Sequence, residues 1–61
     1  MLLALQIARG HSADMVLIDN VVVYQKLDNE GTYAVTYEDP NANNKLFDIY
    51  IKHVTEIKEV H

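Results

Sequence analysis

The sequence contains no cysteine and no tryptophan, and it has only two glycines and one proline among its 61 residues. Without cysteine, the chain can form neither disulfides nor thiolate metal sites. With two glycines, it has no glycine-rich loop of the kind that holds phosphate. A chain of this length makes one domain, residues 1–61, and buries only about 60% of the surface that its unfolded form exposes. Because the core is small and has no covalent support, we expect a homo-oligomer, with a dimer favoured.

Basic residues are also few. Nine acidic residues against five basic ones give a formal charge of −4. This balance argues against a phosphate backbone as the main ligand, because such binding depends on clustered lysine and arginine. The opening MLLALQIARG has no basic leader region, and its apolar run is too short to cross a bilayer. We therefore expect a cytoplasmic protein without membrane contact.

The clearest local pattern is a hairpin around the sequence DNEG at positions 28–31. A type I turn over Asn29 and Glu30, with Gly31 in the left-handed region, predicts a three-residue loop with a G1 bulge. This loop places Leu27 opposite Tyr33 and fixes the register of both strands. One face of the hairpin is then apolar, and it carries Val21, Val23, Leu27, Tyr33, Val35 and Tyr37.

The opposite face of this hairpin is more polar but carries two large apolar residues. Its members are Val22, Tyr24, Lys26, Ala34, Thr36 and Glu38. The N-terminal segment, a ligand or a second copy of the chain could each cover Val22 and Tyr24. We predict that a second copy covers them in part, with Lys26 and Glu38 pairing across the two-fold axis. Tyr50, on the outward face of its own strand, completes the predicted set of interface or partner-binding residues.

The remaining segments predict further strands. Residues 46–52 alternate, with Phe47, Ile49 and Ile51 on one face. The alternation changes at His53, which predicts a tight helical turn before a last strand, with a short helix over 54–60 as the alternative. Residues 15–18 predict a buried strand, and residues 2–8 predict a strand with a helix as the alternative. The fold class is all-β, a small four- to five-stranded barrel or twisted sheet of the SH3-like or Sm-like kind, with room for one short terminal helix.

The histidines are the only side chains suited to catalysis or metal binding near neutral pH. His11 and His53 are each followed three residues later by a carboxylate, Asp14 and Glu56. A metal site would need a third and a fourth ligand, which the sequence does not identify. Ser12 follows His11 directly, but adjacency supplies neither a base opposite the hydroxyl nor a group that orients the base. We therefore predict no catalytic residue, no metal, no cofactor and no enzymatic activity.

The predicted function is that of a small acidic protein-interaction module, such as an inhibitor or adaptor of the phage or mobile-element type. Its acidic residues lie at or near the predicted loops, where a negative surface would steer a basic protein partner. They are Asp28, Glu30, Glu38, Asp39 and Asp48. The alternative function is a small RNA- or nucleotide-binding regulator, because the tyrosines offer aromatic faces on which bases can stack.

The chain opens with Met1-Leu2, enters a predicted strand through the step from Ile18 to Val21, and has a single proline, Pro40. In these positions it resembles the carbon storage regulator family of small RNA-binding dimers. That family has an arginine cluster in its first strand and another arginine near its helix, whereas this chain has only Arg9 in the first segment and Lys52-His53 in the late one. The alignment also needs gaps in the first loop and after Pro40. We assign the chain to no family on this basis, and the resemblance implies RNA binding only as the alternative function.

Overall fold

The computed structural model describes all residues of the chain, 1–61, and every regular element but one is a β-strand. The strands are β1 (Leu2–Arg9), β2 (Ser12–Ile18), β3 (Val21–Lys26), β4 (Tyr33–Asp39), β5 (Lys45–Ile51) and β6 (Val54–Val60). The exception is a single turn of 3-10 helix, η1, at Pro40–Ala42. The all-β prediction is confirmed, but the strands number six instead of four or five, and neither terminus carries a helix.

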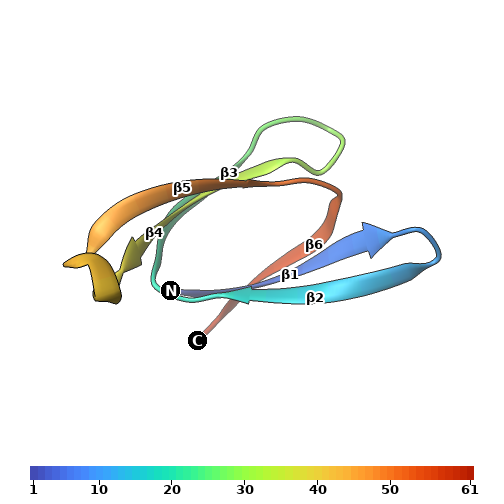
Figure 1. Cartoon of the computed structure of the whole chain (residues 1–61). Coiled ribbons are helices and arrows are strands. Elements are labelled where there is room, and N and C mark those ends of the chain that lie inside the picture. Colours follow the sequence, from blue (N-terminus) through green and yellow to red (C-terminus); the bar gives the residue numbers. More distant parts are fainter.

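The strands form two three-stranded antiparallel sheets, which Figure 1 shows as a lower and an upper layer. Sheet A, the lower layer, has the strand order β2-β1-β6, and sheet B has the order β3-β4-β5. The chain passes from sheet A to sheet B at Asp19–Asn20 and returns at Lys52–His53. Asn20 and His53 have φ angles of 61° and 63°, a left-handed conformation that reverses the chain within two residues.

The core lies between the two sheets. Its buried apolar side chains, each exposed by 8% or less, are Leu3, Leu5, Val21, Val35 and Val54. Isolated backbone hydrogen bonds also tie one sheet to the other. The Val21 N–H donates to the Met1 carbonyl, and the Val54 N–H donates to the Gly31 carbonyl, both at 2.9 Å. The core is therefore shared, since each sheet buries one face against the other.

The register of the β3–β4 hairpin differs by one residue from the prediction. Lys26, not Leu27, pairs with Tyr33. The reason is Asp28, whose carboxylate accepts hydrogen bonds from the Glu30 N–H at 2.8 Å and the Thr32 N–H at 3.0 Å. These bonds, led by those from Thr32, lower the pKa of Asp28. They hold a loop longer than three residues, which closes where the Leu27 N–H donates to the Thr32 carbonyl.

The β3 strand also contains a β-bulge, at Val22. Val21 pairs with Tyr37 and Val23 pairs with Thr36, so Val22 is the extra residue on its strand. Val21 is buried, whereas Val22 and Val23 are 49% and 53% exposed. The predicted apolar face is therefore wrong at Val23, which lies outside, and at Leu27, which is 45% exposed in the loop.

The other strand predictions have mixed outcomes. The strands at 2–8 and 54–60 are confirmed, so the helix alternatives are wrong at both places. The tight helical turn predicted after residue 52 is replaced by the two-residue turn through His53. A second bulge, at Thr55, explains why the apolar Val54 and Ile57 are three residues apart, because Val54 pairs with Ile7 while Glu56 pairs with Gln6. Residues 15–18 form a strand as predicted, but the prediction of burial is wrong because β2 lies at the edge of sheet A.

The alternation predicted for β5 is confirmed. Phe47, Ile49 and Ile51 are partly buried, and the residues between them are exposed. The Tyr37 and Phe47 rings stack with their centroids 5.8 Å apart, which joins β4 to β5 on the core side. The other side of β5 consequently faces away from sheet A.

Candidate binding surface

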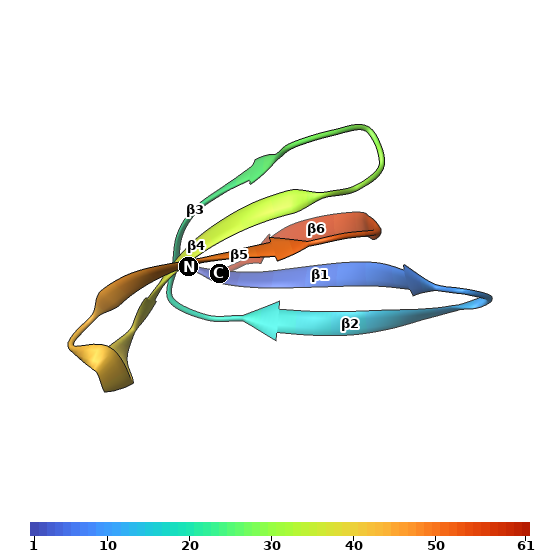
Figure 2. The same ribbon diagram turned by 45° about the horizontal axis from the view of Figure 1, so that its top comes forward.

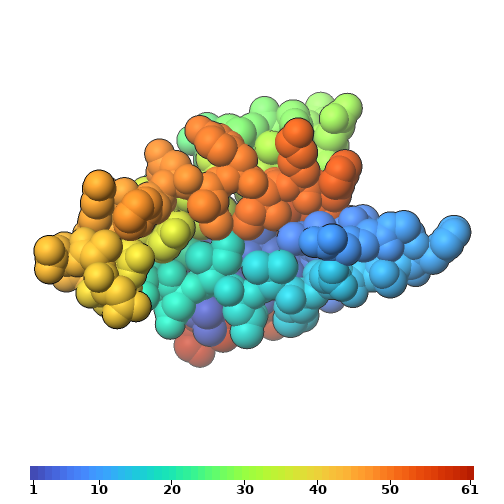
Figure 3. Space-filling view, in the orientation of Figure 1, coloured from blue at the N-terminus to red at the C-terminus, as the bar shows by residue number.

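The outer face of sheet B is the side of β3, β4 and β5 that points away from sheet A. Strand register assigns to it Val23, Gln25, Ala34, Thr36, Glu38, Leu46, Asp48 and Tyr50. The bulged Val22 has no partner in the ladder, and we group it with Val23 because it is exposed to a similar extent. Four of these residues are large, apolar and about half exposed or more: Val22 at 49%, Val23 at 53%, Leu46 at 55% and Tyr50 at 68%. Figure 3 shows β5, in orange, open along the surface in this view. β3 and β5 thus present large apolar side chains on either side of β4, and nothing in the chain covers them.

Cross-strand pairs define how this face is arranged. Thr36 lies between Val23 on one side and Asp48 on the other, and its hydroxyl donates to the Asp48 carboxylate at 2.6 Å. Tyr50 pairs with Ala34, whose small side chain leaves the tyrosine ring without a tall neighbour on β4. The aromatic ring of Tyr50 can therefore lie flat against a partner molecule.

The charge on this face is negative. Glu38 pairs with Leu46 at one end of the face, and Asp48 lies near its middle. Within the three strands no lysine or arginine belongs to the face, because Lys26 and Lys45 pair with Tyr33 and Asp39 in the core-facing register. Lys52, which is exposed, follows β5 directly. An apolar surface that carries two carboxylates matches a partner that is apolar at its centre and basic at its rim.

The structure brings together three of the five residues predicted for partner binding. Val22, Glu38 and Tyr50 share the outer face of sheet B, although they come from three different strands. Tyr24 and Lys26 do not join them, because the one-residue change in register turns both toward the core side. Reasoning from sequence misplaced Val23, which a correct register would have assigned to this face.

Tyr24 is partly buried against the core, and its own chain provides its cover. Its hydroxyl donates to a carboxylate oxygen of Glu59 on β6 at 2.7 Å. This hydrogen bond raises the pKa of Tyr24, since ionising the phenol would place two negative oxygens in contact. Tyr24 consequently links β3 of sheet B to β6 of sheet A.

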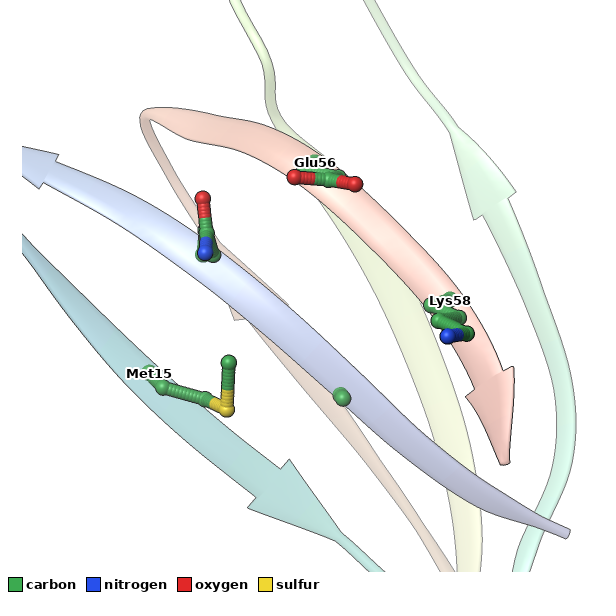
Figure 4. A pocket seen from close by; sticks show the side chains of 5 residues that line it. Met15, Glu56 and Lys58 are labelled. Carbon is green, nitrogen blue, oxygen red and sulfur yellow. The ribbon is translucent and has the colours of Figure 1, made fainter.

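The outer face of sheet A carries a second, shallow surface feature. A depression of about 230 Å³ is lined by Ala4, Gln6, Met15, Glu56 and Lys58, as Figure 4 shows. It follows from strand register, because Gln6 lies between Met15 and Glu56, and the small Ala4 lies beside Lys58. One carboxylate and one ammonium balance the charge, and the lining has no hydroxyl or thiol group.

The histidines do not gather into a site. Asp14, three residues after His11, pairs instead with Arg9 at 2.6 Å. His53 forms the turn between β5 and β6, and no group of three or more His, Asp or Glu side chains is placed to hold a metal ion. No helix of the structure is both long enough and apolar enough to cross a membrane.

Comparisons with known proteins give no relative. No family model, no curated protein and no solved structure matches the chain.

Proposed function

We propose that the protein is a non-enzymatic binding module that takes a protein partner on the outer face of sheet B and works as a homo-oligomer. One observation carries the proposal: four large apolar side chains, about half exposed or more, lie on one face of sheet B, two on β3 and two on β5. Large apolar side chains exposed on one face of a small domain are costly in water and are typical of interaction sites. Small molecules, in contrast, bind mostly in concave pockets, whereas this face is a sheet surface.

The total exposed surface supports the same proposal. The chain exposes 4507 Å², whereas a folded monomer of 7.0 kDa exposes about 4000 Å² by the usual scaling with mass. Nine large apolar side chains are among the exposed residues. Covering such surface in a complex contributes about 25 cal/mol for each Å² of apolar area removed from water.

The chemistry of the face defines the partner class. Tyr50 and the valines would bind an apolar centre, and Glu38 with Asp48 would attract lysine or arginine at its rim. We propose a basic protein as the partner, with the module acting in the cytoplasm as an inhibitor or adaptor of the phage or mobile-element type. We also retain the small β-barrel as the finer fold assignment, supported by the backbone ties between the sheets at Met1–Val21 and Gly31–Val54.

The alternative, an RNA- or nucleotide-binding regulator, depends on Tyr50. An exposed tyrosine on an open sheet can stack on a base. The two carboxylates of the same face would repel the phosphate backbone, which is why we place this function second.

Affinity capture from a lysate, with and without nuclease, tests the proposal. The bait is the wild type beside two variants, Tyr50→Lys on the face and Leu27→Lys, 45% exposed in the hairpin loop, as the matched control. We expect basic proteins that withstand nuclease, that are lost with Tyr50→Lys and that are kept with Leu27→Lys. If every partner is lost on nuclease treatment and the pure protein binds RNA directly, RNA binding becomes the preferred function and protein binding the alternative. Partners retained equally by both variants would contradict the assignment of this face.

A further inference from the structure

Four strands lie at sheet edges, and three of them are protected against pairing with another strand. β3 has the bulge at Val22, and β6 has a bulge as well as charged side chains at 56, 58 and 59. β5 carries Lys45 and Asp48. Bulges and charges are the usual means by which edge strands avoid further pairing.

β2 lacks these protections over half of its length. Its register with β1 runs without a shift from Arg9–Ser12 to Leu3–Ile18. Residues 15–18, MVLI, are apolar without interruption, and Met15 and Leu17 are each 62% exposed. The strand's one charge, Asp14, is paired with Arg9 and lies outside this run. β2 thus forms a regular edge that is apolar over residues 15–18.

The outer backbone groups of β2 have no partner within the chain. Alternate residues of an edge strand turn their N–H and C=O groups away from the sheet. None of the backbone hydrogen bonds outside the ladders involves a residue of β2. Figure 2 agrees, since it shows β2 at the rim of its layer with no strand beyond it.

We propose that β2 pairs antiparallel with β2 of a second copy of the chain, so that the two A sheets join into one six-stranded sheet. This inference deepens the homo-oligomer part of the proposed function and rests on it. A second copy is the occupant because the apolar run is complementary to itself and has no charge that would meet a like charge. The joined outer faces would also bring Met15 and Leu17 of both copies together, which covers part of the excess exposed surface.

The alternation of side chains restricts the register. If both copies keep the same face toward their own sheet B, the two-fold axis must pass through a residue of β2 and not between two. An axis at Val16 overlaps the apolar run most fully, because Met15 then pairs with the partner's Leu17. This arrangement leaves the outer face of sheet B free on both copies, so the dimer would present two binding faces.

Measuring the mass in solution by light scattering is the first test. We expect twice the monomer mass of 7.0 kDa at micromolar concentration. Leu17→Lys should weaken the dimer by about 100-fold or more, because it removes two apolar contacts and places two like charges near the axis. Leu27→Lys, the matched control, should leave the dimer intact, and circular dichroism should show that both variants keep the strand spectrum.

Single cysteine variants give the second test. Because the chain has no cysteine of its own, any disulfide must involve the introduced residue. Val16→Cys should form a disulfide-linked dimer on mild oxidation, since directly opposed residues of an antiparallel pair have the Cα separation that a disulfide needs. A mixture of Met15→Cys and Leu17→Cys should give mainly the mixed dimer. Leu27→Cys, the control, should stay reduced.

The outcomes separate the two proposals. A wild-type monomer overturns this inference and the homo-oligomer part of the proposed function, while the capture experiment still decides partner binding. A dimer that withstands Leu17→Lys and gives no crosslink at Val16→Cys overturns the β2 contact alone.

Discussion

Sheets A and B have the same number of strands and the same antiparallel pairing, but they differ in how far apart in sequence their strands lie. Sheet B is a meander of three consecutive strands, β3, β4 and β5. Sheet A places β1 between β2 and β6, so its central strand pairs with the last strand of the chain. The comparison shows that one half of the fold depends on turns and the other half on contacts between distant segments.

The two sheets also differ in what they bury. The central strand of sheet A contributes Leu3 and Leu5, neither of which is exposed at all. The central strand of sheet B contributes Val35 as its one fully buried side chain, flanked by Tyr33 and Tyr37, which are partly buried. Tyrosines suit such positions, because the ring packs against the core while the hydroxyl reaches water. Sheet A therefore supplies two of the three side chains of the core that are completely buried.

The largest expected effect is on the free energy of unfolding, when buried side chains of the two central strands are truncated. Leu5→Ala should lower the free energy of unfolding by about 2–5 kcal/mol, a large part of the roughly 3–9 kcal/mol expected for a domain of this length. Val35→Ala removes fewer buried carbons and should cost about 2 kcal/mol. Urea unfolding followed by circular dichroism measures both changes. Equal losses would show that the two sheets contribute alike to the core.

The second prediction concerns the contact between the sheets at Gly31. A Cβ atom there would lie 2.5 Å from the Val54 carbonyl oxygen, and the φ of 85° disfavours any side chain. Gly31→Ala should therefore destabilise the protein by about 3 kcal/mol, as strain and a backbone clash combine.

Gly10→Ala is the matched control for Gly31→Ala. Gly10 also has a positive φ, 60°, but nothing lies within 4 Å of the Cβ that it would gain. This variant should cost only about 1 kcal/mol, from the left-handed conformation alone. Similar thermal shifts for the two variants would mean that the loop does not hold the sheets together.

The smallest expected effect is on the hydrogen bond from Tyr24 to Glu59. Because the folded state raises the pKa of Tyr24, its stabilisation is present below pH 10 and is lost as the pH rises through and above that value. Tyr24→Phe should lower Tm by a few degrees at neutral pH and should reduce the loss of stability at high pH. Thermal melts from pH 7 to pH 11 measure this. A wild type and a Phe variant with parallel pH profiles would show that the bond is not formed in solution.

The sequence predicted local features well. The alternation in β5, the strand at 2–8 and the left-handed Gly31 depend on nearest neighbours, and each is present. The hairpin register failed because one side chain, Asp28, extended the loop by accepting two backbone hydrogen bonds. An Asp at the start of a turn signals such bonds, but it does not fix the length of the loop.

The candidate surface could be predicted only in part, for the same reason. Glu38 and Tyr50 were placed correctly on an outward face because β4 and β5 have no bulge in their pairing. Val23 and Tyr24 exchanged sides, since a one-residue change in register turns every side chain of a strand to the other face. The exposure of Met15 and Leu17 could not be foreseen, because a continuous apolar run looks the same in a central strand and at an edge.

The pairing of β1 with β6 has a consequence for the order of folding. The β1–β2 hairpin and the β3–β4–β5 meander need only short loops to close, whereas residues 54–60 must return across the whole chain to reach β1. Closing such a long loop is entropically costly and slows folding. During synthesis, every strand except β6 can be complete while one side of β1 still has free backbone groups. We expect the arrival of β6 to be the step that commits the chain to its native state, and the interval before it to be when the chain is most prone to aggregate.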